Sequence, residues 1–211
     1  MLAQGQVDRE WANATARHCC PQGPRTRGVV RVVAAQPDEP VVSSVRTAVW
    51  LGVVGAGGNV TIALLPMYRA DLRLSSGAVT GLFGLYALSL IPALPIGGAL
   101  ADRYGPGRLL LPISIATIAP SATFAVGGDN IAVLIVGRLM QGLVSGAAFT
   151  AGTALLSRTG VHQGRGGRTT AVAMTRGFAV GALGGGFAGQ WGPDPTALPY
   201  LLHILAVMAA T

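Results

Sequence analysis

The sequence predicts an all-α integral membrane protein, a bundle of six helices of which five are complete spans and the sixth is shorter. Hydrophobic residues make up 51% of the 211-residue chain and charged residues 11%, less than half the roughly 25% of a soluble domain. Long apolar runs recur from residue 47 onward, and short polar links separate them. Too few charges remain to cover a surface that faces water, so we expect the surface to face lipid.

The apolar runs are long enough to cross a bilayer. The first, at 47–67, has 21 residues, which span roughly 30 Å at about 1.5 Å per residue. The other expected helices lie at about 78–101, 109–127, 131–156, 171–191 and 197–211. About 15 residues of the last precede the end of the chain, fewer than the ~20 of a full span. The short links require neighbouring helices to be antiparallel.

Residues 1–46 differ from the rest of the chain. They are polar, contain proline and many arginines, and lack the apolar core of a signal peptide, so we expect a disordered cytoplasmic tail. The adjacent Cys19 and Cys20, with His18, make an incomplete zinc set. The chain has no lysine, which excludes a Walker-type phosphate loop. The sequence therefore predicts neither a metal site nor a cofactor.

The arginines predict the orientation. If the N-terminus is cytoplasmic, eleven of the fifteen arginines lie on the cytoplasmic side, and only Arg69 and Arg73 lie outside. This is the positive-inside distribution of a multi-pass protein of the cell (plasma) membrane. A sequence pI near 10.7 would otherwise suggest nucleic acid as a partner. Because topology accounts for the positive charge, the predicted partner is the lipid bilayer and not nucleic acid.

The link after the second run contains a compact polar motif. Its members are Gly98, Asp102, Arg103, Gly105 and Arg108. Gly98 is expected to permit close helix approach and Gly105 to supply turn geometry. Asp102 can pair with Arg108 or with a helix N-terminus.

The fourth run carries a charge inside the membrane. Arg138 lies seven residues within the run, roughly 10 Å deep, where a charge is costly unless it faces a cavity or a partner. Arg138, Gln141 and Ser145 follow an i, i+3, i+7 spacing and share one helix face. We expect this face, with Gly142 and with Asn59 of the first run, to line a translocation path. The alternative is that Arg138 snorkels to the outer headgroups.

The fifth run is rich in small residues. Gly177, Gly181, Gly185 and Gly186 have the spacing that lets membrane helices pack closely, and we interpret them as a packing motif.

Together these three motifs resemble signatures of the major facilitator superfamily of secondary transporters. The link is similar to Gly-x-x-x-Asp-Arg-x-Gly-Arg-Arg, and departs from it at Pro106 and Gly107. The fourth run resembles Arg-x-x-Gln-Gly. The fifth resembles the antiporter signature Gly-x-x-x-Gly-Pro-x-x-Gly-Gly, with Ala182 in place of proline.

The resemblance implies the six-helix N-terminal half-bundle of a twelve-helix protein, built from two inverted three-helix repeats. In that family the substrate lies between two halves that rock against each other. The equivalent of Asp102 contacts the other half, which makes the link a cytoplasmic gating motif. A second six-helix half and a small-molecule substrate are therefore expected partners.

The implied function is proton-coupled efflux of a drug or metabolite by antiport, with the substrate, the coupling ion and the direction left open. No Asp or Glu lies within a run, and His203 is the other titratable candidate there. Two alternatives are a truncated, non-transporting membrane protein and a half-transporter that needs a partner half. An intramembrane serine protease using Ser145 and His203 is disfavoured because Leu143 breaks the Gly-x-Ser-Gly setting.

Overall fold

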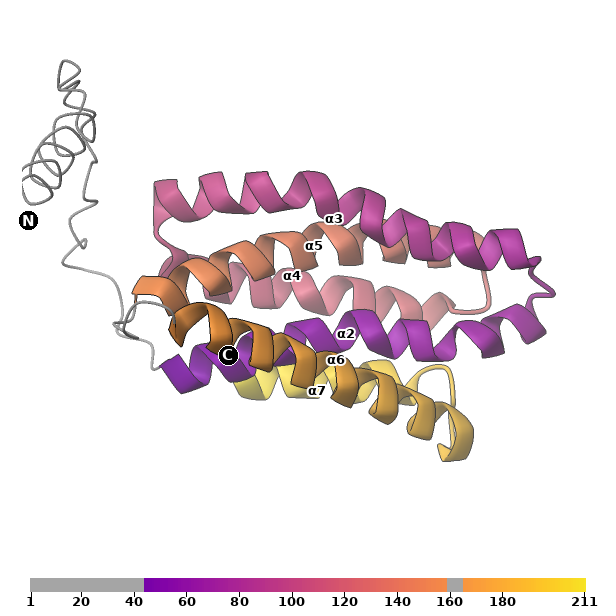
Figure 1. Cartoon of the computed structure of the whole chain (residues 1–211). Helices are drawn as coiled ribbons and strands as arrows, with labels where there is room; N and C mark the ends of the chain where they lie inside the picture. The colour runs from indigo at the N-terminus through magenta and orange to yellow at the C-terminus, as the bar shows by residue number, and fades with distance from the viewer. Residues whose placement is uncertain (1–43, 159–164) are drawn as a thin grey trace, which may run out of the picture. The chain divides into compact units, whose positions relative to one another are not determined.

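The computed structural model describes residues 44–158 and 165–211, which form six α-helices that alternate in direction (Figure 1). They are α2 (Ser44–Asp71), α3 (Ser76–Tyr104), α4 (Pro106–Gly127), α5 (Ile131–Arg158), α6 (Arg165–Trp191) and α7 (Leu198–Ala210). Most of the tail expected at 1–46, from residue 1 to residue 43, lies outside the described residues, and so do Cys19 and Cys20.

The helices extend beyond the apolar runs that predicted them. The first begins at Ser44 and ends at Asp71 rather than covering 47–67, because helical hydrogen bonding continues into polar residues beyond the hydrocarbon. Four helices, α2 to α5, are long and apolar enough to cross a membrane. The sequence counted five complete spans. With 27 residues α6 has the length, but Arg168, Arg176 and many glycines make it less apolar.

Local signals define the ends of several helices. The Ser75 hydroxyl accepts a hydrogen bond from the backbone N–H of Ala78 at 3.2 Å and caps α3. Gly105 ends α3 with φ at 86°, a region that favours glycine, and its N–H donates to the carbonyl of Ala101. Pro106 follows as the first residue of α4, where its missing N–H leaves no helix hydrogen bond unmade.

Helices α2 and α6 meet through backbone rather than side chains. A Cβ added to Gly177 or Gly181 would collide with the backbone of Gly52 or Ala56, and one on Gly185 would lie 2.9 Å from the Cα of Val60. The contacts repeat every four residues on both helices, so one face of each is involved. Three of the four glycines expected to form a packing motif thus lie in this contact. An added Cβ on the fourth, Gly186, would meet no atom within 4 Å.

Helices α3 and α5 make a second close contact. A Cβ on Gly142 would strike the Tyr86 carbonyl oxygen and the Ser89 hydroxyl. A Cβ on Gly146 would lie 2.6 Å from the Cβ of Ala93. Lipid offers no hydrophobic drive for helix association, so such small-residue contacts supply the van der Waals packing that holds the helices together.

The contacts follow an approximate two-fold pattern. Helix α3 packs on α5 as α6 packs on α2, and α4 packs on α5 as α7 packs on α2. The pattern relates the first three helices to the last three, as two inverted repeats would.

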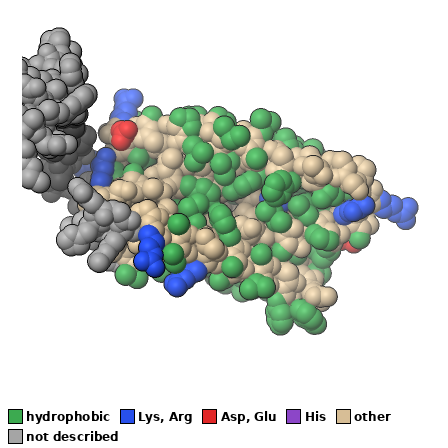
Figure 2. All heavy atoms as spheres, in the orientation of Figure 1, with side chains coloured by type: hydrophobic (Ala, Val, Ile, Leu, Met, Phe, Trp, Pro, Cys, Tyr) green, Lys and Arg blue, Asp and Glu red, His purple; other side chains and the backbone are tan. Residues whose placement is uncertain are grey.

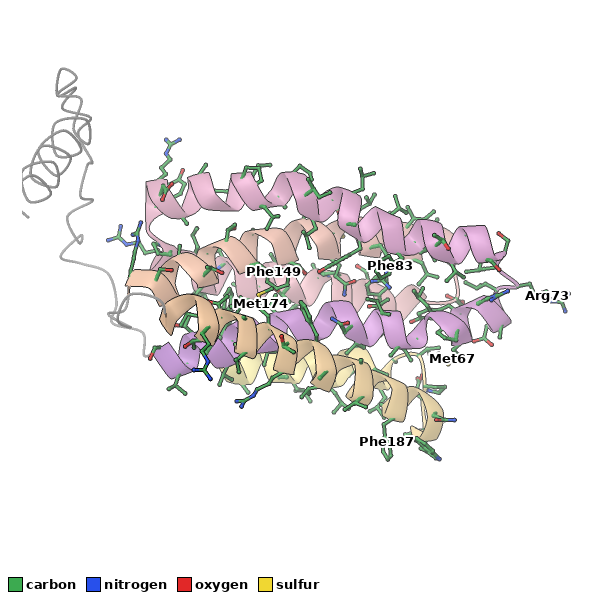
Figure 3. The ribbon with its side chains drawn as sticks, in the orientation of Figure 1. Met67, Arg73, Phe83, Phe149, Met174 and Phe187 are labelled. Atoms are coloured by element: carbon green, nitrogen blue, oxygen red, sulfur yellow. The ribbon has the colours of Figure 1, made fainter. Side chains whose placement is uncertain are left out.

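Apolar side chains fill the bundle on either side of its centre. One cluster includes Trp50, whose Nε1 donates to Ser114 Oγ at 2.7 Å, and Phe149 of α5, which lies beside Met174 of α6 (Figure 3). The other includes Phe124 stacked on Tyr200, with ring centroids 5.2 Å apart.

The exterior is also apolar over the middle of the bundle, whereas arginines gather toward its ends (Figure 2). Arg73 points away from the bundle at one end (Figure 3).

Gly181→Ala tests the contact between α2 and α6. We expect a loss of about 1–3 kcal/mol of unfolding free energy, because the new methyl group would lie 2.7 Å from the Ala56 Cα. Gly184→Ala is the matched control, since an added Cβ there meets no atom within 4 Å and alanine favours the helix. Equilibrium unfolding in mixed micelles measures both. Equal stability of the two variants would contradict the contact.

Asp194 shapes the turn before α7. Its Oδ1 accepts hydrogen bonds from the backbone N–H groups of Ala197 at 3.0 Å and Thr196 at 3.1 Å, and from the Thr196 hydroxyl at 2.8 Å. The bond from the Ala197 N–H and those from Thr196 hold the pKa of the Asp194 carboxyl below its ordinary value of 3.8.

This lowered pKa predicts an acid-sensitive turn. Because the ionised carboxylate is favoured in the folded state, its contribution is present above about pH 3.8 and is lost as the pH falls through the lowered pKa. Hydrogen exchange at Thr196 and Ala197, corrected for the intrinsic rate, should show protection at pH 5 that weakens toward pH 2. In Asp194→Asn, which has no titrating group, the protection should not change over this range. The same pH dependence in both proteins would refute the assignment.

Candidate functional site

The centre of the bundle holds a buried guanidinium. Arg138 of α5 is 1% exposed, and its Nη1 donates to Gln141 Oε1 at 3.2 Å. Its Nε and Nη2 atoms have no hydrogen-bond partner within the described residues. The side chain therefore does not snorkel to a headgroup, and two of its donor atoms face the interior unsatisfied. A buried charge in this state is costly.

Gln141 links this arginine to α2. Its Nε2 donates to the carbonyl oxygen of Gly57 at 2.9 Å and to Thr61 Oγ1 at 3.3 Å, while its Oε1 accepts from Arg138. The predicted i, i+3 spacing brings Arg138 and Gln141 together, and the amide uses both ends. One side chain thus holds the guanidinium and ties the two central helices.

Three phenol groups interact with the guanidinium through space, and none of them accepts a hydrogen bond from it. They belong to Tyr200, Tyr86 and Tyr68, and no carboxylate of the described residues interacts with Arg138 in this way. The hydroxyl oxygens of Tyr68 and Tyr200 lie 2.9 Å apart. A phenol can accept a hydrogen bond without carrying a charge. The site thus keeps a net positive charge in a polar but uncharged lining.

Ser145 lies in the same region, beside a tyrosine. The residue is 4% exposed, and its hydroxyl interacts with the phenol of Tyr86 of α3. It also lines, with Gln141, a small cavity of about 10 Å³. The structure thus brings Ser145 beside the Arg138 cluster, as its i+7 position predicted.

His203 of α7 lies on the other side of that cavity. Its Nδ1 lies 2.8 Å from Ser121 Oγ, and its Nε2 lies 3.0 Å from the carbonyl oxygen of Val53. A carbonyl only accepts, so Nε2 carries a hydrogen; in the neutral ring Nδ1 accepts from Ser121. The ring packs so closely on Gly57 that an added Cβ there would lie 2.6 Å from Nε2. His203 therefore bonds to Ser121 and Val53, and no hydrogen bond joins it to Ser145 among the described residues. The two side chains do not form a serine–histidine pair.

Two residues expected to line the path have different positions. The Asn59 Nδ2 donates to the Gly55 carbonyl of its own helix at 3.4 Å, and the side chain is half-buried. Gly142 faces α3 and serves helix packing.

Sequence reasoning missed the tyrosines. Three of the four tyrosines in the chain act on Arg138. A usable signal existed: a buried arginine needs polar neighbours, and with no acid in any span the phenols are natural candidates.

The motif in the link between α3 and α4 lies at the surface. Asp102 Oδ1 is 3.8 Å from Nη2 of Arg158, at the end of α5, with side-chain exposures of 83% and 37%. The sequence suggested Arg108 or a helix N-terminus as the partner of Asp102, and in the structure the partner is Arg158 instead. The reason is that the antiparallel bundle brings the ends of α3 and α5 together. Arg103 lies over the Tyr104 ring at 5.4 Å. Exposed pairs of this kind contribute at most about 1 kcal/mol.

Gly98 does not make the helix contact expected of it. An added Cβ there would meet no atom within 4 Å. Its neighbour Gly97 provides the contact instead, because a Cβ at that position would lie 2.6 Å from the Ala147 Cα of α5. The face of α3 that carries Gly98 is open in the described bundle.

These features can be compared with known proteins. A family model described as the Major Facilitator Superfamily matches residues 48–211, which include all six described helices almost entirely. The chain belongs to this superfamily of transporters. It is a multi-pass membrane protein, as the sequence predicted.

Several curated members of the superfamily are similar to the chain. The quinolone resistance protein NorA of Staphylococcus aureus (strain MRSA252) is 28% identical over 137 residues, 64% of this chain and 35% of that protein. The bacillibactin exporter of Bacillus subtilis (strain 168) is 30% identical over 100 residues, 46% of this chain and 25% of that protein. The chain thus covers about a third or less of the length of these relatives.

Variants of the facilitator-superfamily site should separate structural from functional residues. Gln141→Leu should lower the unfolding free energy by about 1–2 kcal/mol, because it removes the only acceptor of Arg138 seen in the described residues and two bonds to α2. Arg138→Met should leave stability unchanged or raise it, because it removes a half-satisfied buried charge.

Thr123→Val is the control for both variants. Among the described residues its hydroxyl bonds only to the Ala119 carbonyl of its own helix, so we expect a change below about 0.5 kcal/mol. Equilibrium unfolding in mixed micelles measures all three. A large loss of stability in Arg138→Met would show that the arginine has a structural role.

Proposed function

We propose that this chain is the N-terminal six-helix half of a transporter that exports a small molecule in exchange for protons. The observation that carries the proposal is Arg138, a buried charge with two unpartnered donor atoms in the described residues. Such a residue inside a membrane bundle marks a transport pathway more often than a structural contact. The names of the relatives, a quinolone resistance protein and an exporter, support efflux.

The proton carrier belongs to the second half in this proposal. The aspartates of the described residues, Asp71, Asp102, Asp129 and Asp194, lie at helix ends or in links. An acid facing Arg138 must therefore come from elsewhere. The positive guanidinium would favour the ionised form of such an acid, or an anionic group of the substrate. Protonation would weaken that attraction and couple the proton to release.

The gate lies at the end of the bundle where α3 meets α5. We infer that this end and the N-terminus face the cytoplasm of the cell membrane, because most of the arginines lie on this side. The exposed pair of Asp102 and Arg158 is weak enough to open when two halves rock against each other.

The second candidate is a half that assembles with a partner half, or a truncated product that has none. Open positions at Gly98 and Gly186, together with exposed Phe187 and Leu183, favour a partner surface. Crosslinking in native membranes discriminates between them. A specific dimer or complex favours assembly, and a labile monomer favours a truncated product.

Flux through the chain alone tests the half-transporter proposal. Liposomes that contain the purified chain and a pH gradient should take up a fluorescent quinolone no faster than empty liposomes, because the second wall of the pathway is missing. Robust pH-driven uptake would overturn the requirement for a second half.

A hybrid protein tests the role of Arg138. Residues 48–211 would replace the matching segment of the S. aureus quinolone resistance protein in cells that lack other quinolone pumps. The hybrid should lower quinolone accumulation, and Arg138→Met should abolish this effect, whereas Arg73→Gln, which removes an exposed charge, should not. Western blots of membranes verify equal insertion. Export by the Arg138→Met hybrid, or an inserted but inactive parent hybrid, would contradict the proposal.

A further inference from the structure

A groove runs along the outer side of the bundle between α6 and α7, with α2 as its floor. Its volume is about 970 Å³, at the upper end of the roughly 300–1,000 Å³ of ligand pockets. Val180 of α6 and Leu202 of α7 line it and are 65% and 51% exposed. The glycines of α6 that contact α2 also line the groove, so no large side chain projects into it from these positions.

Two arginines stand in this apolar groove. Arg168, Val172, Arg176 and Val180 follow one another at intervals of four residues and share one face of α6. Arg176 lies eleven residues from the start of α6, about 16 Å along its axis, and five residues inside the apolar run expected at 171–191. Both side chains are exposed, and neither has a hydrogen-bond or ion-pair partner within the described part of the chain.

The groove therefore has an asymmetric chemistry. Its arginines lie toward the N-terminal end of α6, and the rest of its lining is apolar apart from Ser44, Thr169 and His203. An unpaired arginine in hydrocarbon costs several kcal/mol unless an anion or water meets it. A neighbouring protein helix would need a carboxylate at the depth of Arg176. An amphiphile with an anionic head and an apolar tail matches both ends of the groove.

We propose that the groove binds one anionic phospholipid from the leaflet in which α6 begins. Its phosphate lies between Arg168 and Arg176, within reach of the long, flexible stems of both arginines. One acyl chain follows Val180, Leu202 and Ala206. The inference rests on membrane insertion and not on the proposed transport. Anionic lipids concentrate in the leaflet that faces arginine-rich segments, which here is the end of the bundle with most arginines.

Native mass spectrometry of the full chain, released from detergent micelles, tests the site. The protein is titrated with phosphatidylglycerol and, separately, with phosphatidylcholine of the same acyl chains. We expect one phosphatidylglycerol to bind preferentially. Arg168→Gln and Arg176→Gln should each weaken this binding about fivefold, as the loss of one arginine–lipid attraction predicts, and phosphatidylcholine binding should not change.

Two further variants make the result specific to the groove. Val180→Trp should block the acyl portion and reduce phosphatidylglycerol binding while both arginines remain. Arg108→Gln removes an exposed arginine that does not line the groove and should have no effect. Equal affinity for the two lipids, or unchanged binding in Arg168→Gln/Arg176→Gln, would overturn the proposal. So would a photo-crosslink from position 180 to a second polypeptide rather than to lipid, because it would show that the groove is a protein interface.

Discussion

The backbone-to-backbone contact between α2 and α6 is the constraint on which the rest of the bundle depends. Glycines at 177, 181 and 185 bring the two helix axes closer than side chains would allow. The α3–α5 contact at Gly142 and Gly146 has the same character. Because lipid does not drive apolar surfaces together, these two contacts supply much of the close packing that a soluble bundle would obtain from its core. Each contact joins a helix of the first repeat to one of the second.

The polar centre connects the two close-packed pairs. Gln141 of α5 bonds to the Gly57 carbonyl of α2, and His203 of α7 packs on the same Gly57 while it bonds to Ser121 of α4. Helices α2, α4, α5 and α7 therefore converge at one level of the bundle, between two apolar clusters. Close packing fixes the positions of these polar groups, and the groups in turn set the register of the helices.

The sequence predicted the helices and much of the site, for identifiable reasons. Apolar runs located all six helices, because only a helix satisfies its backbone in lipid. The spacing of Arg138 and Gln141 predicted their shared face, because it depends on one helix alone. The tyrosines, the Asp102–Arg158 pair and the contact at Gly97 depend on which sides of different helices meet. Helices that are apolar on all sides carry no periodic signal of which side faces inward, so the sequence could not specify those pairings.

The burial of Arg138 sets a balance between stability and function. A guanidinium with two donor atoms that have no partner among the described residues is costly to bury, yet it is held in place by Gln141 and by contacts that do not involve the charge. The close-packed pairs can tolerate this penalty because their stability comes from contacts between small residues, which do not depend on the charge of Arg138. In the proposed transporter, the unsatisfied donors are what an incoming anion or carboxylate would meet. A fully paired arginine would make the bundle more stable and leave nothing for a ligand to bind, so the incomplete hydrogen bonding of Arg138 is the feature most directly tied to transport.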